Sequence, residues 1–119
     1  MYSIKVEGDF SSAHNLRGYR GKCEDLHGHN WKVEVIIQGS LLDKIGMLVD
    51  FKIVKRKLYS VLDKLDHKYL NAIAYFKKNN PTSENIAKYI YDRLKEKNLK
   101  VSSVVVWESN KASATYYED

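Results

Sequence analysis

Three of the four histidines stand where they could bind one metal ion together. His27 and His29 flank a single glycine, and residues two apart in an extended segment point to the same side. His14 ends a segment that is expected to pair with the segment starting at Trp31, so a hairpin would bring its imidazole beside the other two. Three neutral imidazoles suit zinc, and water or substrate would fill the last position because no fourth protein ligand is evident. The plainer interpretation is that His27 and His29 share a face only through strand alternation.

The single cysteine, Cys23, is a candidate catalytic base. It stands four residues before His27 on a loop that contains glycine. Its thiolate would be close enough to face a metal-bound substrate and take a proton from it. The alternative is that Cys23 is simply a small buried apolar residue.

Asp66 and His67 form a second pair that could move protons. They follow the end of a helical pattern, and a carboxylate there can orient an imidazole and raise its basicity. Helix capping or ordinary surface chemistry would explain the same dipeptide.

Glu108 follows the apolar run from Val104 to Trp107. A carboxylate at the end of a buried strand needs a partner that offsets its desolvation. A guanidine-like edge with two neighbouring N–H donors, such as that of a pterin ring, would serve, since one carboxylate accepts both. The alternative is an ordinary charged residue at a strand end.

Two hairpins are expected to position these residues. Residues 2–14 alternate between apolar and polar side chains, and a second strand carries Trp31, Val33, Val35 and Ile37 on one face before it ends near Gly39. Residues 101–107 are β-branched, and residues 112–117 follow after a short turn.

Two helices are expected between the hairpins. Asp50 can cap the first, whose apolar positions recur at three- and four-residue spacing as far as Leu65. Thr82 or Ser83 can cap the second, which should end near Asn98. The order β-β-α-α-β-β predicts an α+β fold in which two helices back one antiparallel sheet, and it excludes a parallel doubly wound sheet.

The size of the chain predicts one domain, residues 1–119, and an oligomer. A chain of 119 residues can build only one core, and its nine tyrosines and two tryptophans suggest apolar area meant for partner subunits. The single cysteine excludes an internal disulfide framework.

The net charge of +5 comes from basic residues that are scattered along the chain. This distribution favours a phosphorylated small molecule over nucleic acid as the partner. Neither a signal peptide nor an apolar segment of membrane length is recognisable, so no membrane association and a cytoplasmic location are expected.

Five motifs together resemble the 6-pyruvoyl-tetrahydropterin synthase family. In chain order they are Phe10-Ser11-Ser12-Ala13-His14, Cys23-Glu24-Asp25-Leu26-His27-Gly28-His29, Leu65-Asp66-His67, Pro81-Thr82-Ser83-Glu84-Asn85 and Trp107-Glu108. The resemblance covers nearly the whole chain and implies the tunnelling fold. In that fold the β-β-α-α-β-β units associate through their sheets into trimeric β-barrels, and two trimers usually stack into a hexamer with active sites between subunits.

The resemblance also implies roles for individual residues. Zinc would be bound by His14, His27 and His29. Cys23 would be the catalytic base, Asp66 and His67 the second acid/base pair, and Glu108 the pterin anchor. Thr82 and Ser83 fall where the family also contacts the pterin ring.

Within the family, the Cys-x-x-x-His-Gly-His spacing from Cys23 to His29 resembles the branch that makes 6-carboxytetrahydropterin for queuosine and 7-deazaguanine synthesis. That resemblance implies conversion of 7,8-dihydroneopterin triphosphate to 6-carboxytetrahydropterin, acetaldehyde and triphosphate without a redox cofactor. Glu24 instead resembles the branch that cleaves dihydroneopterin to 6-hydroxymethyl-7,8-dihydropterin for folate. Glu24 is therefore either an acid/base group for this second activity or a solvated loop residue.

A third interpretation is a zinc-stabilised scaffold or pterin-binding protein without catalysis. Such a protein has no use for Cys23, Asp66 and His67 beside an open metal position. Imidazole sites also accept iron, nickel and copper, so the histidines alone do not identify the metal.

Overall fold

A long antiparallel hairpin organises the computed structural model, which describes residues 1–119. Strand β1 (Tyr2–His14) pairs with β2 (His27–Gly39) from one end to the other. The first strand has its predicted bounds, but β2 begins four residues before the predicted Trp31. Residues 27–30 at the start of β2 were not predicted as strand because they are polar and show no apolar alternation.

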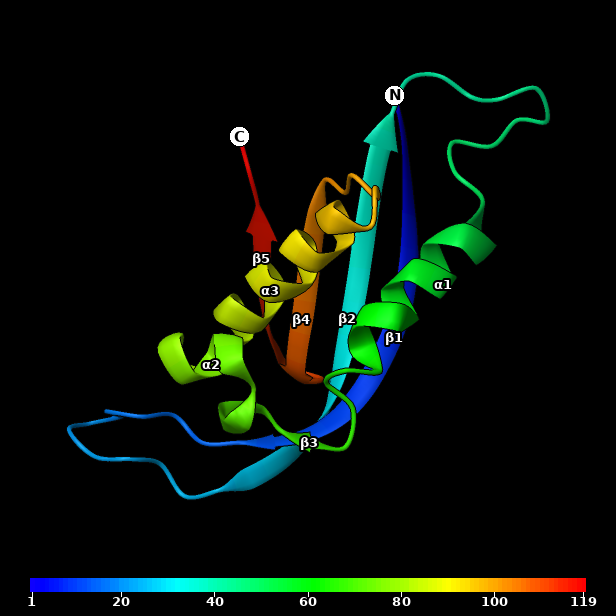
Figure 1. Cartoon of the computed structure of the whole chain (residues 1–119). Coiled ribbons are helices and arrows are strands. Elements are labelled where there is room, and N and C mark those ends of the chain that lie inside the picture. The colour runs from blue at the N-terminus through cyan, green and yellow to red at the C-terminus, as the bar shows by residue number, and fades with distance from the viewer.

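The second predicted hairpin joins the same sheet. It consists of β4 (Ser103–Ser109) and β5 (Ala112–Tyr117), and β4 pairs with β2 in antiparallel orientation. The short strand β3 (Lys68–Tyr69) pairs in parallel with β1, which gives the order β3-β1-β2-β4-β5 (Figure 1). The sheet was predicted to be antiparallel throughout, but it contains this one parallel pair. Strand β3 was not predicted because two residues are too few to show an alternation.

Two main helices cross one face of this sheet (Figure 1). Helix α1 (Phe51–Leu62) is capped by the Asp50 side chain, and α3 (Ser83–Glu96) by the Thr82 side chain, both as predicted. The 3-10 helix η1 (Leu70–Ala72) and the short helix α2 (Ala74–Lys78) lie between them and were not predicted.

Helix α1 is three residues shorter than the predicted pattern. Beyond Leu62 the chain continues in tight turns, and the backbone N–H groups of both Leu65 and Asp66 donate to the Leu62 carbonyl oxygen. Leu65 is nevertheless fully buried, so its side chain keeps the apolar pattern although its backbone has left the helix.

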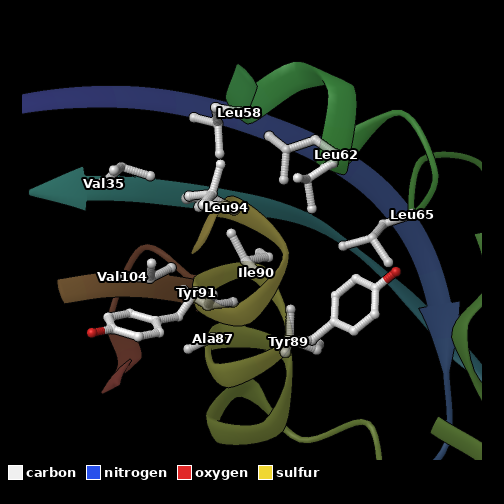
Figure 2. Packing of buried hydrophobic residues seen from close by; sticks show 14 of the residues in the cluster. Val35, Leu58, Leu62, Leu65, Ala87, Tyr89, Ile90, Tyr91, Leu94 and Val104 are labelled. Atoms are coloured by element: carbon white, nitrogen blue, oxygen red, sulfur yellow. The ribbon is translucent and has the colours of Figure 1, made fainter. Parts of the chain in front are cut away.

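The core fills the space between the helices and one face of the sheet. Figure 2 shows the contact between α3 and the sheet, with labelled side chains from four elements and the turn after α1: Val35, Leu58, Leu62, Leu65, Ala87, Ile90, Leu94 and Val104. No helix covers the opposite face, where Lys5 and Trp107 both bond to the Glu34 carboxylate. None of the helices has the length and apolar character needed to span a membrane.

Candidate metal centre and active site

The end of the β1–β2 hairpin brings two histidine rings together in an edge-on arrangement. His14 and His27 are register partners, and their Nε2 atoms lie 3.1 Å apart. The Nδ1 atom of His14 lies 2.8 Å from the carbonyl oxygen of Pro81, and that of His27 lies 2.8 Å from the carbonyl oxygen of Asp25. Because a carbonyl oxygen can only accept, each Nδ1 carries a hydrogen and donates it.

This arrangement leaves the two Nε2 atoms of the neutral rings as acceptors whose lone pairs converge. Two such atoms repel each other unless a cation or a proton lies between them. A metal ion would relieve this conflict, and a far nitrogen that donates to a carbonyl is the usual outer support of a metal-bound histidine. The donor set therefore fits a metal ion.

His29 and Glu108 complete the group. The Nε2 atom of His29 is buried without a hydrogen-bond partner and lies 3.0 Å from Oε1 of Glu108, which is 3.6 Å from Nε2 of His14. The ligand atoms of His14, His27, His29 and Glu108 all lie within 4.8 Å of one another. The sequence predicted three histidine ligands and no fourth protein ligand, whereas the fold places the Glu108 carboxylate beside the three imidazoles.

The surroundings of His29 favour its neutral form. Burial lowers the pKa of His29 below its ordinary value, and positive charge on His14 or His27 lowers it further, against the opposing effect of Glu108 and Glu24. A neutral imidazole is the form that binds a metal ion.

Cys23 lies on the loop of residues 15–26, which projects from the end of the hairpin (Figure 1). Its side chain is exposed and lines a shallow surface hollow together with Glu24 and Asp25. The cysteine is not among the four residues of the metal group.

The Glu24 side chain is held by the backbone. Its Oε1 atom accepts a hydrogen bond of 3.2 Å from the N–H of Leu16 and lies 3.7 Å from Nδ1 of His27. The Glu24 N–H in turn donates to the Leu16 carbonyl oxygen at 2.9 Å. Glu24 thus links the cysteine loop to the chain just beyond β1.

Asp66 and His67 contact each other, as the sequence suggested. Oδ2 of Asp66 lies 3.0 Å from Nδ1 of His67, and Oδ1 accepts a 2.8 Å hydrogen bond from the N–H of Ser11 on β1. The Ser11 N–H is the main cause that lowers the pKa of Asp66, and His67 adds to it against the opposing effect of burial. The His67 side chain is 83% exposed, and the pair is not part of the metal group.

Thr82 is the N-cap of α3 and Ser83 is its first residue, immediately after the Pro81 carbonyl that bonds to His14. The Thr82 side chain accepts from the N–H of Asn85 and closes the first turn. Sequence reasoning missed the carbonyl groups of Pro81 and Asp25, because the role of a backbone carbonyl leaves no trace in residue identity.

Comparisons with known proteins agree on one family. A family model described as 6-pyruvoyl tetrahydropterin synthase matches residues 3–119. The 6-carboxy-5,6,7,8-tetrahydropterin synthase of Haemophilus influenzae is 33% identical over 141 residues, which cover 99% of this chain and 100% of that protein. The dihydroneopterin monophosphate aldolase of Pyrococcus furiosus is 34% identical over 110 residues, 90% of each chain.

A solved structure supports the fold. The 6-pyruvoyl tetrahydropterin synthase of Caenorhabditis elegans superimposes with a TM-score of 0.86 at 27% identity, over 99% of this chain and 96% of that one. The similarity extends over the whole arrangement of sheet and helices, so the chain has the tunnelling fold.

Proposed function

Since the chain belongs to the 6-pyruvoyl tetrahydropterin synthase family, we propose that it converts 7,8-dihydroneopterin triphosphate to 6-carboxytetrahydropterin, acetaldehyde and triphosphate. The observation that carries this proposal is the convergence of His14, His27, His29 and Glu108 at one end of the sheet. The similarity to the Haemophilus influenzae 6-carboxy-5,6,7,8-tetrahydropterin synthase supports this choice of reaction. The atoms of dihydroneopterin divide between the two organic products, and water accounts for the release of triphosphate, so the reaction needs no external oxidant.

The metal is proposed to be zinc, bound by the three imidazoles. Neutral imidazole nitrogens and a carboxylate oxygen are ligands that zinc accepts in catalytic sites. When bound, the ion would polarise the side-chain oxygens of the substrate and make the neighbouring C–H bond more acidic. Pro81 and Asp25 would hold two of the ligand rings in the orientation that this binding needs.

Proton transfer is assigned to Cys23 and to the Asp66–His67 pair. Cys23 would accept a proton from the substrate side chain, and His67, oriented by Asp66, would return a proton to the neighbouring carbon or oxygen. The exposed positions of Cys23 and His67 suit groups that meet only when subunits assemble.

The assembly is proposed to be a trimeric barrel, with two trimers stacked into a hexamer. The outer edge of β5 pairs with no strand of its own chain, and such an edge is a template for another strand. The polar sheet face that carries Lys5 and Glu34 would then line the inside of the barrel.

Glu108 is proposed to accept the paired N–H donors of the pterin ring, with Thr82 and Ser83 in further contact with it. One oxygen of Glu108 lies 3.0 Å from Nε2 of His29. Accepting two pterin donors requires both carboxylate oxygens. Glu108 must therefore turn away from the imidazoles when the substrate binds.

Product analysis by mass spectrometry tests the proposal. The zinc-loaded protein is incubated with 7,8-dihydroneopterin triphosphate, beside the Cys23→Ala variant. We expect 6-carboxytetrahydropterin and acetaldehyde from the unmodified protein and neither from the variant. Absence of both products with the unmodified protein would overturn the assignment and revive a pterin-binding role.

A second activity, cleavage of dihydroneopterin to 6-hydroxymethyl-7,8-dihydropterin, is favoured by one observation. The carboxylate of Glu24 lies 3.7 Å from Nδ1 of His27, on the side of this metal-group ring that faces away from Nε2. The similarity to the Pyrococcus furiosus aldolase is consistent with it. To test it, the unmodified protein and the Glu24→Ala variant are each incubated with dihydroneopterin. The second activity predicts that the unmodified protein forms 6-hydroxymethyl-7,8-dihydropterin and that the variant does not. The first activity alone predicts no such product from either.

A further inference from the structure

The chain just beyond β1 is held along one edge by two asparagine side chains. The N–H of Asn15 donates to Oδ1 of Asn71 at 3.0 Å, and Nδ2 of Asn71 donates back to the Asn15 carbonyl oxygen at 2.7 Å. The N–H of Arg17 donates to Oδ1 of Asn80 at 2.9 Å, and Nδ2 of Asn80 donates to the Arg17 carbonyl oxygen at 3.0 Å.

These two amides extend the pairing between β1 and β3 beyond the end of β3. Strand β3 pairs with β1 only at Ser12 and Ala13. Asn15 and Arg17 follow at two-residue spacing, and the backbone N–H and carbonyl groups of both bond to an asparagine amide on the same edge. A side-chain amide offers one N–H donor and one oxygen acceptor, so it can replace the peptide group of a missing strand. Asn71 is only 8% exposed, and its two hydrogen bonds to Asn15 are partly buried.

The opposite edge of the same segment holds the cysteine loop. Glu24 exchanges two hydrogen bonds with the backbone of Leu16, and Nδ2 of Asn15 donates to the Glu24 carbonyl oxygen at 3.2 Å. Residues 15–17 are thus bonded on both sides, with Asn71 and Asn80 on one side and Glu24 on the other. Cys23 immediately precedes Glu24 in the chain, so the position of Cys23 depends on this segment.

Asn80 also belongs to the turn that orients a metal ligand. The adjacent Pro81 carbonyl accepts from Nδ1 of His14, while the Asn80 carbonyl accepts from Nδ2 of Asn85 at 2.8 Å. A single turn before α3 therefore touches both the ring of His14 and the backbone that carries the cysteine loop.

We propose that Asn80, supported by Asn71, is a positioning residue that sets the loop bearing Cys23 relative to the metal centre. Asn80 does not touch the substrate and acts through Arg17, Leu16 and Glu24. The expected effect on catalysis rests on the proposed role of Cys23 as the base. The expected effect of Asn80 on the position of the loop does not depend on that role.

The chain offers a matched control beside Asn80. Asn79 is the same residue type in the same turn, but its Nδ2 donates only to the carbonyl oxygen of Tyr75 in α2, at 3.0 Å. Asn79→Ala removes an asparagine side chain without touching residues 15–17. Asn80→Ala removes both bonds to Arg17.

Hydrogen exchange tests the structural step without any assay of turnover. In zinc-loaded protein we expect the amides of Leu16, Arg17 and Glu24 to exchange faster in Asn80→Ala than in Asn79→Ala, with zinc content unchanged in both. Equal exchange in the two variants would overturn the proposal. If Asn80→Ala does not fold, Asn80→Asp serves instead, because it keeps the acceptor for the Arg17 N–H and loses the donor.

Steady-state kinetics test the catalytic step. A misplacement on the order of 1 Å costs about 10²-fold in rate, so kcat of Asn80→Ala should fall by about that factor while KM changes little. We expect Asn80→Asp to lower kcat as well, because a carboxylate oxygen would then face the Arg17 carbonyl oxygen, and Asn79→Ala to keep its kcat. Faster exchange in Asn80→Ala with an unchanged kcat would overturn the positioning role, and an unmodified protein without turnover would overturn the proposed function instead.

Discussion

At the scale of single residues, two of the three imidazoles in the metal group are held by hydrogen bonds to the far side of the ring. The carbonyl groups of Pro81 and Asp25 fix the tautomers of His14 and His27, and this makes both Nε2 atoms available to one ion. A histidine that lacked such a partner would lose ligand basicity as well as orientation. Backbone carbonyls therefore do as much to define the site as the residue types that the sequence displays.

Separate substitutions should divide metal binding from proton transfer. His27→Ala removes one ligand and should abolish both zinc binding and turnover. Cys23→Ala should keep zinc and substrate binding and lose turnover, because Cys23 is outside the metal group. Zinc content by atomic emission, together with the product assay, checks both, and turnover retained in Cys23→Ala would contradict its role as the base.

Glu108→Gln tests whether the Glu108 carboxylate serves mainly to bind the pterin ring or the metal ion. An amide oxygen is a weaker metal ligand than a carboxylate, and an amide cannot accept two N–H donors with charge assistance. We expect a weaker affinity for a pterin ligand in calorimetric titration and only a small change in zinc affinity. An unchanged pterin affinity would remove the anchor role and leave Glu108 as a metal ligand.

The lowered pKa of Asp66 has a consequence for stability. A carboxyl group whose pKa is lower in the folded state stabilises the fold when ionised, and this contribution is lost as the pH falls through the folded pKa. The stabilisation is therefore complete above the ordinary value of 3.8 and disappears below it. Asp66→Asn should be less stable than the unmodified protein at neutral pH and approach it in acid, as urea unfolding at a series of pH values would reveal. A difference that is constant with pH would contradict the assignment.

At the scale of elements, the position of α1 on β1 depends on the lack of a side chain at Gly8. A Cβ atom there would lie 2.9 Å from Cδ1 of Leu62 and 3.1 Å from Cδ2 of Leu58. The helix that leads to Asp66 can therefore lie directly on the strand that leads to His14. This contact relates the positions of two parts of the site.

Gly8→Ala should destabilise the protein by about 1–3 kcal/mol, because the added methyl group overpacks this contact. Gly28→Ala is a suitable comparison, since a Cβ atom there would meet only the Ser12 carbonyl oxygen at an ordinary 3.6 Å. Thermal or urea unfolding of both variants measures the difference. Equal stabilities would show that α1 shifts without cost.

At the scale of the whole molecule, one chain leaves Cys23 and His67 outside the metal group. Cys23 lies on a projecting loop, whereas the His67 ring faces solvent beside β1. The proposed site between subunits would bring these residues to the metal group of a neighbouring chain, and the unpaired edge of β5 is where such an assembly would form.

Mixing inactive variants tests this shared site. Cys23→Ala and His67→Ala should each be inactive alone. Co-expression should restore part of the activity if one subunit supplies Cys23 and another supplies His67, because some sites then receive both intact residues. Light scattering should give a mass several times the 13.8 kDa of one chain. A monomeric mass, or no recovery in the mixed oligomer, would contradict the shared site.

The sequence by itself determined the elements whose patterns are long and local. The alternation of β1, the caps of α1 and α3 and the bounds of β5 follow from side chains within one segment, and the structure has them as predicted. The types of the candidate ligands were equally visible, since His27 and His29 are close in sequence. Elements of two to five residues, such as β3 and α2, left no readable period.

Only the tertiary structure decided how distant segments meet. Pro81 orients His14 from 67 positions away, Glu108 joins the three imidazoles, and Asn80 replaces a missing strand beside Arg17. These contacts depend on backbone groups and on the path of the chain between them. A residue type states which bonds a side chain can form, but only the fold determines which partner lies within reach.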